Sequence, residues 1–244
     1  MRDQAILSFG ATVRGPRSRE DKRPNQDAWV QASGRFGNLI AVCDGLGSRS
    51  NSRLGARAAC KAVCNAARHW PGLAIVNDPK HVIRLIEILW RLELGSNTVG
   101  DCATTCTLAL REPDGQMLLA GLGDSVAICR FQDGRIEMKG GRPDSSFGSE
   151  TLALGMPHQI SDWWTHTIAP ADGRAILLAS DGVSDDLTFE RIGGFVDWLL
   201  TQFGGLPAPE RSRALRSTLQ KWPVPNHTDD KTIAILAENP GALT

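Results

Sequence analysis

The sequence of 244 residues has no tyrosine, no excess of either charge and no long apolar run. Its 27 lysine and arginine residues balance 27 aspartate and glutamate residues, so no net charge draws the chain toward nucleic acid or acidic membranes. A membrane-spanning helix needs roughly 18 consecutive apolar residues, and no stretch approaches that length. The first ten residues, MRDQAILSFG, lack the basic and then apolar order of a signal peptide. We therefore expect a cytoplasmic monomer that binds neither nucleic acid nor membranes.

The six cysteines form no CxxC pair, and their neighbours are mostly apolar. Thiols of this kind are usually small buried hydrophobic groups in a reducing compartment. A cysteine-dependent phosphatase needs an arginine six residues after its nucleophile, and Cys43 has this spacing through Arg49. Because Cys43 lies in an apolar strand without a glycine-rich phosphate loop, its thiol pKa should be raised rather than lowered. A cysteine nucleophile is therefore disfavoured.

Two hydrophobic periodicities alternate along the chain. A period of two predicts strands at residues 5–13, 28–32, 39–43, 103–110, 117–121, 125–131, 135–139, 163–168, 175–179 and 232–236. Helical spacing predicts helices at residues 52–70, 81–94, 189–203 and 209–222, with a loop over 140–157. Because no repeat or linker divides the chain, we expect one α+β domain over residues 1–244, with antiparallel sheets covered by helices.

Aspartates fall at the boundaries of the predicted strands. They are Asp27, Asp44, Asp124, Asp181 and Asp230. A carboxylate at a strand end is held rigidly yet projects into a loop, and Mg²⁺ and Mn²⁺ prefer such oxygen ligands. Any one of these aspartates is more often part of a turn. Five at strand boundaries favour a shared metal site, although spacing alone does not bring them together.

Six short motifs occur in an order and spacing that resemble a known family. They are RPNQDA at 23–28, VCDGLG at 42–47, GDCATT at 100–105, GDS at 123–125, ASDGVSD at 179–185 and DDKT at 229–232. Together they resemble the type 2C metal-dependent protein serine/threonine phosphatases, in the compact bacterial form that consists of the catalytic domain alone. The resemblance implies a four-layer β-sandwich of two antiparallel sheets flanked by α-helices. It also implies phosphoprotein substrates made by a cognate kinase.

The resemblance further implies a centre of two Mn²⁺ or Mg²⁺ ions, with positions for a third. The residues implied for the first two ions are Asp44, which bridges them, Asp181, Asp230, Asp27 and the carbonyl of Gly45. Asp124 and Asp185, with Asp181 shared, match the positions of the third ion. Two such ions lower the pKa of a bound water and offset charge on the phosphoryl oxygens.

Arg23 matches the family residue that grips the substrate phosphate. A guanidinium binds two phosphate oxygens at once, which lysine does not. A second interpretation remains open, because residues 14–23 contain five basic side chains that are equally consistent with a solvated loop.

Several positions depart from the family pattern. Leu46 stands where animal relatives commonly have a histidine that is proposed to protonate the leaving group. His227 is a candidate substitute, or an ordinary exposed histidine. Gln26 replaces a frequent glutamate, and Lys231 replaces the usual asparagine and is expected to face solvent.

Two further features have alternative interpretations. Arg49 and Arg53 either contact a phosphoprotein or form a polar lead into the helix at 52–70. Trp163 and Trp164 belong either to the core or to a docking surface.

Two alternatives to a general serine/threonine phosphatase share its fold. One is a regulatory phosphatase restricted to a single partner. The other is a catalytically weak module that only binds phosphoproteins, which the complete set of acidic residues argues against.

Overall fold

The computed structural model describes residues 6–73, 78–141, 151–170, 172–222 and 228–238. The strands are β1 (Ile6–Val13), β2 (Ala28–Gly34), β3 (Gly37–Cys43), β4 (Cys106–Arg111), β5 (Met117–Leu122), β6 (Val126–Phe131), β7 (Ile136–Gly140), β8 (Trp164–Ile168), β9 (Gly173–Ala179) and β10 (Lys231–Glu238). The α-helices are α1 (Pro16–Glu20), α2 (Ser52–Leu73), α3 (Pro79–Leu94), α4 (Asp181–Ser184), α5 (Phe189–Phe203) and α6 (Ala208–Gln220). Short 3₁₀ helices occupy η2 (Val99–Cys102) and η3 (Ile160–Asp162).

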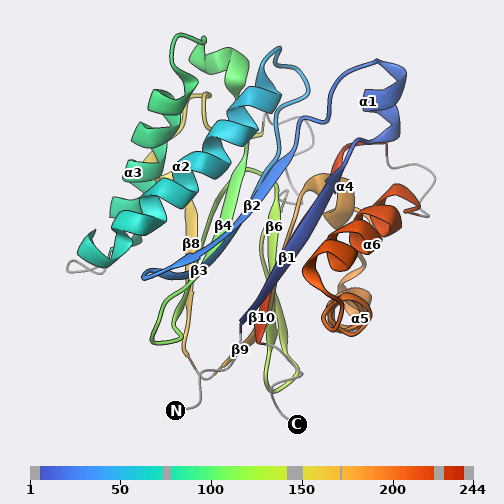
Figure 1. Cartoon of the computed structure of the whole chain (residues 1–244). Coiled ribbons are helices and arrows are strands. Elements are labelled where there is room, and N and C mark those ends of the chain that lie inside the picture. Colours follow the sequence, from blue (N-terminus) through green and yellow to red (C-terminus); the bar gives the residue numbers. More distant parts are fainter. Residues whose placement is uncertain (1–5, 74–77, 142–150, 171, 223–227, 239–244) are drawn as a thin grey trace.

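The strands form two antiparallel sheets of five strands each. One sheet has the order β1-β10-β9-β6-β7 and the other β2-β3-β4-β5-β8. Helices α2 and α3 cover the outer face of the second sheet, and α5 and α6 cover the outer face of the first (Figure 1). The expected four-layer sandwich is confirmed.

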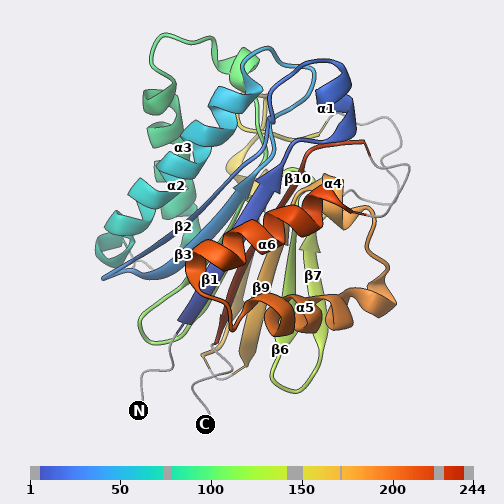
Figure 2. The ribbon, with the colours of Figure 1, turned by 45° about the vertical axis from the view of Figure 1, so that its right-hand side comes forward.

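Side-chain alternation along the strands supplies three apolar layers. On β9, Leu177 packs toward α5 and α6, while Leu178 points between the two sheets. On β3, Leu39 packs toward α2 and α3, while Ile40 points between the sheets. Both faces of these strands are therefore buried, which explains why their sequences are nearly continuous apolar runs. In the rotated view α5 and α6 lie in front of the first sheet, while α2 and α3 stay on the other side of the sandwich (Figure 2).

The predicted elements agree with the structure except at certain loops and ends. Helices α1 and α4 were not predicted, because they have five and four residues and are too short to show a helical hydrophobic period. The strand expected over 103–110 begins only at Cys106. Residues 142–150 of the loop expected over 140–157, and His227, lie outside the described residues.

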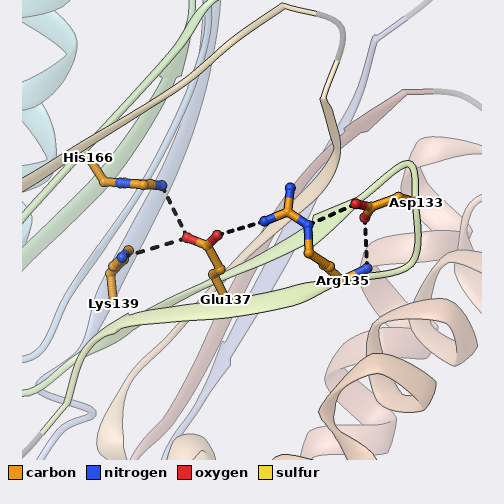
Figure 3. A network of polar contacts seen from close by, with 5 residues as sticks. All are labelled: Asp133, Arg135, Glu137, Lys139 and His166. Carbon is orange, nitrogen blue, oxygen red and sulfur yellow. Dashed lines mark hydrogen bonds and ion pairs between the residues drawn. The ribbon is translucent and has the colours of Figure 1, made fainter.

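A chain of polar and charged side chains links the two sheets at one side of the sandwich. Glu137 on β7 lies 3.1 Å from Arg135 and 3.6 Å from Lys139, and Arg135 also pairs with Asp133 at 2.8 Å (Figure 3). His166 on β8 reaches the same Glu137 at 3.4 Å. Two acids and two permanently charged bases therefore balance one another where β7 and β8, the terminal strands of their sheets, lie side by side.

No helix in the described ranges is both long and apolar enough to cross a bilayer.

Candidate metal and phosphate site

Strand register gathers the predicted aspartates at one end of the sandwich. Ala28 pairs with Cys43, so Asp27 and Asp44 continue past neighbouring strand ends. In the other sheet Ala179 pairs with both Ile233 and Val126. The segments that follow β9 and precede β10 and β6 therefore meet at the same end. A cleft of about 460 Å³ opens there, lined by Asp44, Asp124, Asp181, Asp229 and Arg23 among others.

The backbone of Asp44 is fixed by two threonines from the GDCATT motif. Its N–H donates to Thr105 Oγ1 at 2.9 Å, and its carbonyl accepts from Thr104 Oγ1 at 2.9 Å and from Thr105 N–H at 2.8 Å. Both threonines are buried. These contacts leave the Asp44 side chain to face the cleft. The GDCATT motif alone does not indicate this role of the two threonines.

The Asp44 carboxyl is electrostatically unfavourable in its charged form. Burial raises its pKa well above the ordinary value, and the negative charges of Asp27, Asp181, Asp124 and Asp229 raise it further. A divalent cation would reverse the sign of this interaction. The same crowding that penalises the metal-free carboxylate thus favours binding of a cation.

Asp27 is buried behind the cleft wall. Its Oδ2 accepts from Ser180 Oγ at 3.0 Å and from Thr232 Oγ1 at 2.6 Å. Burial, together with the charges of Asp230 and Asp181, raises its pKa to about 7 although the Thr232 hydroxyl opposes the shift. Asp27 therefore joins the ends of β2, β9 and β10 through hydroxyl groups, and it does not line the cleft itself.

The structure distinguishes Asp230 from its neighbour Asp229. Both Asp230 oxygens accept backbone hydrogen bonds, from Gly15 N–H at 2.7 Å and from Gln26 N–H at 2.6 Å, and the side chain is 2% exposed. Asp229 instead lines the cleft. Sequence reasoning had selected Asp230 as the cleft ligand; in this structure its carboxylate is turned inward to the backbone, and Asp229 occupies the cleft-facing position.

Lys231 does not face solvent as expected. It is 4% exposed, and its Nζ donates to the carbonyl of Asp229 at 3.3 Å. Burial lowers its pKa, against the opposing charges of Asp186 and Asp229. The lysine thus supports the turn that carries Asp229.

Close backbone packing explains the glycine that follows Asp181. A Cβ at Gly182 would lie 1.8 Å from the carbonyl oxygen of Asp230, which no side chain tolerates. Asp181 is the first residue of α4 and is separated from β9 by Ser180 alone, so this packing fixes the approach of α4 to the start of β10.

The two positions implied for a third ion have different surroundings. Asp124 lines the cleft, where its Oδ2 accepts from Thr151 Oγ1 at 3.1 Å. Asp185 is exposed at the C-terminal end of α4 and is not a cleft-lining residue.

Two arginines reach the cleft from the segment around α1. Arg23 Nη1 donates to the carbonyl of Gly47 at 3.1 Å, and its Nε lies 3.7 Å from Asp21. Arg17, from α1, lines the same cleft. Both arginines therefore belong to the cleft wall, and both are exposed to solvent. Arg17 was missed because nothing in the sequence separates it from the other arginines nearby.

Leu46 and Gln26, which depart from the family pattern, also line the cleft. Leu46 is held by its N–H, which donates to the carbonyl of Ala103 at 3.0 Å. Gln26 Nε2 donates to Ser52 Oγ, the first residue of α2. Gln26 therefore ties the cleft wall to the start of α2.

The segment 151–163 borders the cleft through Thr151 and is anchored to α3. Leu154 exchanges two backbone hydrogen bonds with Thr104. His158 Nε2 and Trp163 Nε1 both contact Glu87 Oε1, at 2.9 and 3.0 Å. Trp163 is 5% exposed and belongs to the core beneath α2 and α3, which confirms the core interpretation for this residue.

The cysteines are unsuited to nucleophilic catalysis. Hydrogen bonds with the Cys106 and Cys60 thiols, and burial, raise the pKa of Cys43 well above its ordinary value. Cys129 also has an arginine six residues later, Arg135, but burial raises its thiol pKa to about 12. The disfavoured cysteine mechanism gains no support.

The cleft donors suit a hard divalent cation by their chemistry. They are carboxylate and carbonyl oxygens, with no thiolate or imidazole among the described cleft residues. In the described part of the chain, no three acidic, histidine or cysteine side chains are already grouped around one point.

The fold is thus a four-layer sandwich, and the cleft at one end of it is lined by oxygen donors and arginines. The sequence profile of protein phosphatase 2C matches residues 14–220. The chain therefore belongs to the protein phosphatase 2C family, and its class is that of phosphoprotein phosphatases.

Solved structures of similar fold include three bacterial phosphatases. A bacterial serine phosphatase has a TM-score of 0.64 at 17% identity, over 96% of this chain and 98% of that one. The serine/threonine phosphatase of Mycobacterium tuberculosis has a TM-score of 0.63 at 17% identity, over 95% and 98%. That of Staphylococcus aureus has 0.62 at 17%, over 96% and 95%. At these identities the likeness shows the fold alone. Among curated proteins, no sequence matches significantly.

Proposed function

We propose that this chain is a Mn²⁺- or Mg²⁺-dependent serine/threonine phosphatase that removes phosphate from proteins phosphorylated by a cognate kinase. The observation that carries the proposal is the crowding around Asp44, whose pKa is raised by burial and by Asp27, Asp181, Asp124 and Asp229. Such a group of carboxylates is compatible with a stable charged state only when a cation offsets the repulsion.

Asp44, Asp181, Asp229 and the Gly45 carbonyl are the residues we assign to two ions, with Asp124 available to a third. Asp27 acts behind them through hydroxyl contacts and Asp230 through the backbone. When bound, divalent ions supply an activated water at neutral pH and neutralise phosphoryl charge.

Arg23 and Arg17 supply the phosphate-binding side of the cleft. A guanidinium donates two parallel hydrogen bonds to a phosphate dianion and fixes its orientation. The hydrogen bond to the Gly47 carbonyl holds Arg23 at the cleft, where Asp21 lies 3.7 Å from its Nε. Leu46 has no proton to give to the departing serine or threonine alkoxide, so we expect water in the open cleft to supply that proton.

The test is hydrolysis of a phosphothreonine peptide with Mn²⁺, with a chelator, and by Asp181→Asn. We expect release of phosphate that requires metal and is lost in the variant. Asp133→Asn, the same chemical change at an exposed turn, serves as the matched control and should keep activity. Metal-independent hydrolysis, or none with any divalent ion and several peptides, would contradict the proposal.

A further inference from the structure

One face of α2 carries a row of basic side chains that the cleft does not use. Arg53, Arg57, Lys61 and Arg68 are all exposed. At 3.6 residues per turn these four positions fall within an arc of about 80°, so they form one ridge along the helix. We call this row the α2 ridge.

The α2 ridge borders two hollows. A groove of about 610 Å³ separates it from β2 and is lined on the opposite side by Trp29 and Asn25. A second hollow of about 570 Å³ lies on the other flank of the same helix, next to Glu93. Arg53, Arg57 and Lys61 line both hollows, so their side chains can turn to a ligand in either.

The positive charge of the ridge is only partly compensated. Lys61 pairs with Glu93 at 2.9 Å, and Arg68 donates to Asn65. Within the described ranges, no carboxylate forms an ion pair with Arg53 or Arg57. Asp27 also lines the groove, but its carboxyl is buried and receives hydroxyl hydrogen bonds. The chain as a whole is neutral, so this excess of positive charge is local.

The groove begins where the cleft wall ends. Gln26 lines the cleft, and its neighbours Asn25 and Asp27 line the groove. Ser52, which holds the Gln26 amide, directly precedes Arg53. Both views of the ribbon show α2 and β2 running side by side away from this point (Figures 1 and 2).

We infer that the groove beside the α2 ridge binds an acidic segment of the phosphoprotein substrate, on one side of the residue that enters the cleft. The inference rests on the proposed function. The ridge from Arg53 to Arg68 is about 22 Å long at the helical rise, which matches roughly seven residues of extended chain. Aspartate, glutamate or further phosphorylated residues within about ten positions of the reacting residue are therefore the preferred sequence.

Steady-state kinetics of the full chain with Mn²⁺ test this selectivity. Three phosphothreonine peptides of equal length are compared, with a glutamate cluster before the phosphoresidue, with the cluster after it, and with glutamines throughout. We expect one acidic peptide to be preferred in kcat/KM. In the double variant Arg53→Glu/Arg57→Glu, the ratio of kcat/KM between that peptide and the neutral one should fall at least tenfold, mostly through KM. A tenfold change corresponds to about 1.4 kcal/mol.

The matched control is Lys80→Glu/Arg84→Glu, the same charge reversal at the same spacing on the exposed face of α3. This control should keep the wild-type ratio. No acidic preference in the wild type, or an equal loss of preference in both variants, overturns the docking site.

Direct binding separates this inference from the proposed function. If the wild type hydrolyses no peptide, fluorescence anisotropy of a labelled acidic peptide still reports docking, which should be tenfold weaker in the Arg53→Glu/Arg57→Glu variant. A single-stranded oligonucleotide that competes with this peptide at equal charge concentration would assign the ridge to nucleic acid and overturn the polypeptide assignment.

Discussion

At the β7–β8 side of the sandwich, acidic Asp133 and Glu137 alternate with basic Arg135 and Lys139 (Figure 3). The cleft differs, because it gathers carboxylates whose charges oppose one another at Asp44. The charges of the β7–β8 network balance one another without a ligand, whereas the carboxylates of the cleft need a cation to balance their charge. A charged group whose neighbours balance it is expected to serve the fold, and one whose neighbours repel it is expected to serve binding.

The largest expected effect comes from Asp44→Asn. We predict a loss of metal-dependent hydrolysis of at least about 10³-fold, or ~4 kcal/mol of activation free energy. The same change should raise the thermal midpoint of the chelator-treated protein, because it removes a half-buried carboxylate whose charge its neighbours disfavour. Phosphate release and thermal unfolding on one preparation measure both.

Asp44→Asn should therefore lower activity but raise the thermal midpoint without metal. Loss of a structural carboxylate would instead lower the thermal midpoint. In the presence of excess Mn²⁺ the wild type should gain stability through ligand linkage, and the variant should gain less. A variant that is both inactive and less stable without metal would show that Asp44 serves the fold, contrary to the comparison above.

The adjacent pair Asp229 and Asp230 tests the comparison within two residues. Asp229→Asn should lower kcat about 10²-fold with little effect on the free energy of unfolding. Asp230→Asn should cost about 1–3 kcal/mol of stability, because an amide nitrogen would face one of the two backbone N–H donors, Gly15 or Gln26. Urea denaturation without metal, beside Mn²⁺ titration of activity, compares the pair.

If instead Asp230→Asn lowers kcat and Asp229→Asn lowers stability, Asp230 is the cleft ligand. Each variant is the other's control, since both remove one charge at the start of the same strand.

The sequence was sufficient to predict the layers and the strand-end position of most cleft residues. Asp44 and Asp181 each follow an apolar run, and antiparallel pairing brings such ends together. It was insufficient to choose between Asp229 and Asp230. That choice depends on the backbone of Gly15 and Gln26, which are more than 200 residues away in sequence and carry no side-chain signal.

Lys231 shows a related limit of the sequence reasoning. A lysine at the start of a strand is ordinarily exposed. Its burial depends on the local turn, where the Asp229 carbonyl accepts from its ammonium group. Of the α2 ridge, the sequence analysis singles out only Arg53. The groove beside the ridge is not predictable from the sequence, because it depends on the packing of β2 against α2.

A smaller effect is expected from the pair that anchors the segment beside Thr151. A hydrogen bond to Glu87 raises the pKa of His158, whose side chain is 8% exposed, and Asp162 adds to the shift. Burial alone would raise the pKa of Glu87, but the hydrogen bonds from His158 and Trp163 and the charge of Arg91 lower it. The histidine contribution to stability is therefore complete below the unfolded pKa of about 6.5 and is lost as pH rises through the raised folded value.

We predict that the wild type loses about 1–2 kcal/mol from this pair between pH 6 and 9, relative to Glu87→Gln. Urea unfolding of both proteins across that range, without metal, measures the difference. Parallel curves would show that His158 is neutral in the folded protein. His158→Gln should be as insensitive to pH as Glu87→Gln.

The smallest effect is predicted for Glu137→Gln, at the centre of the balanced network. Exposed ion pairs contribute little because water and salt screen them, so the thermal midpoint should shift by less than about 2 °C. Phosphatase activity and its metal dependence should stay at the wild-type level, since no residue of this network lines the cleft. A large loss of stability that disappears in high salt would show that the balanced charges hold β7 to β8. In that case the network and the cleft would both depend on electrostatic interactions. They would differ only in that the charges attract one another in the network and repel one another in the cleft.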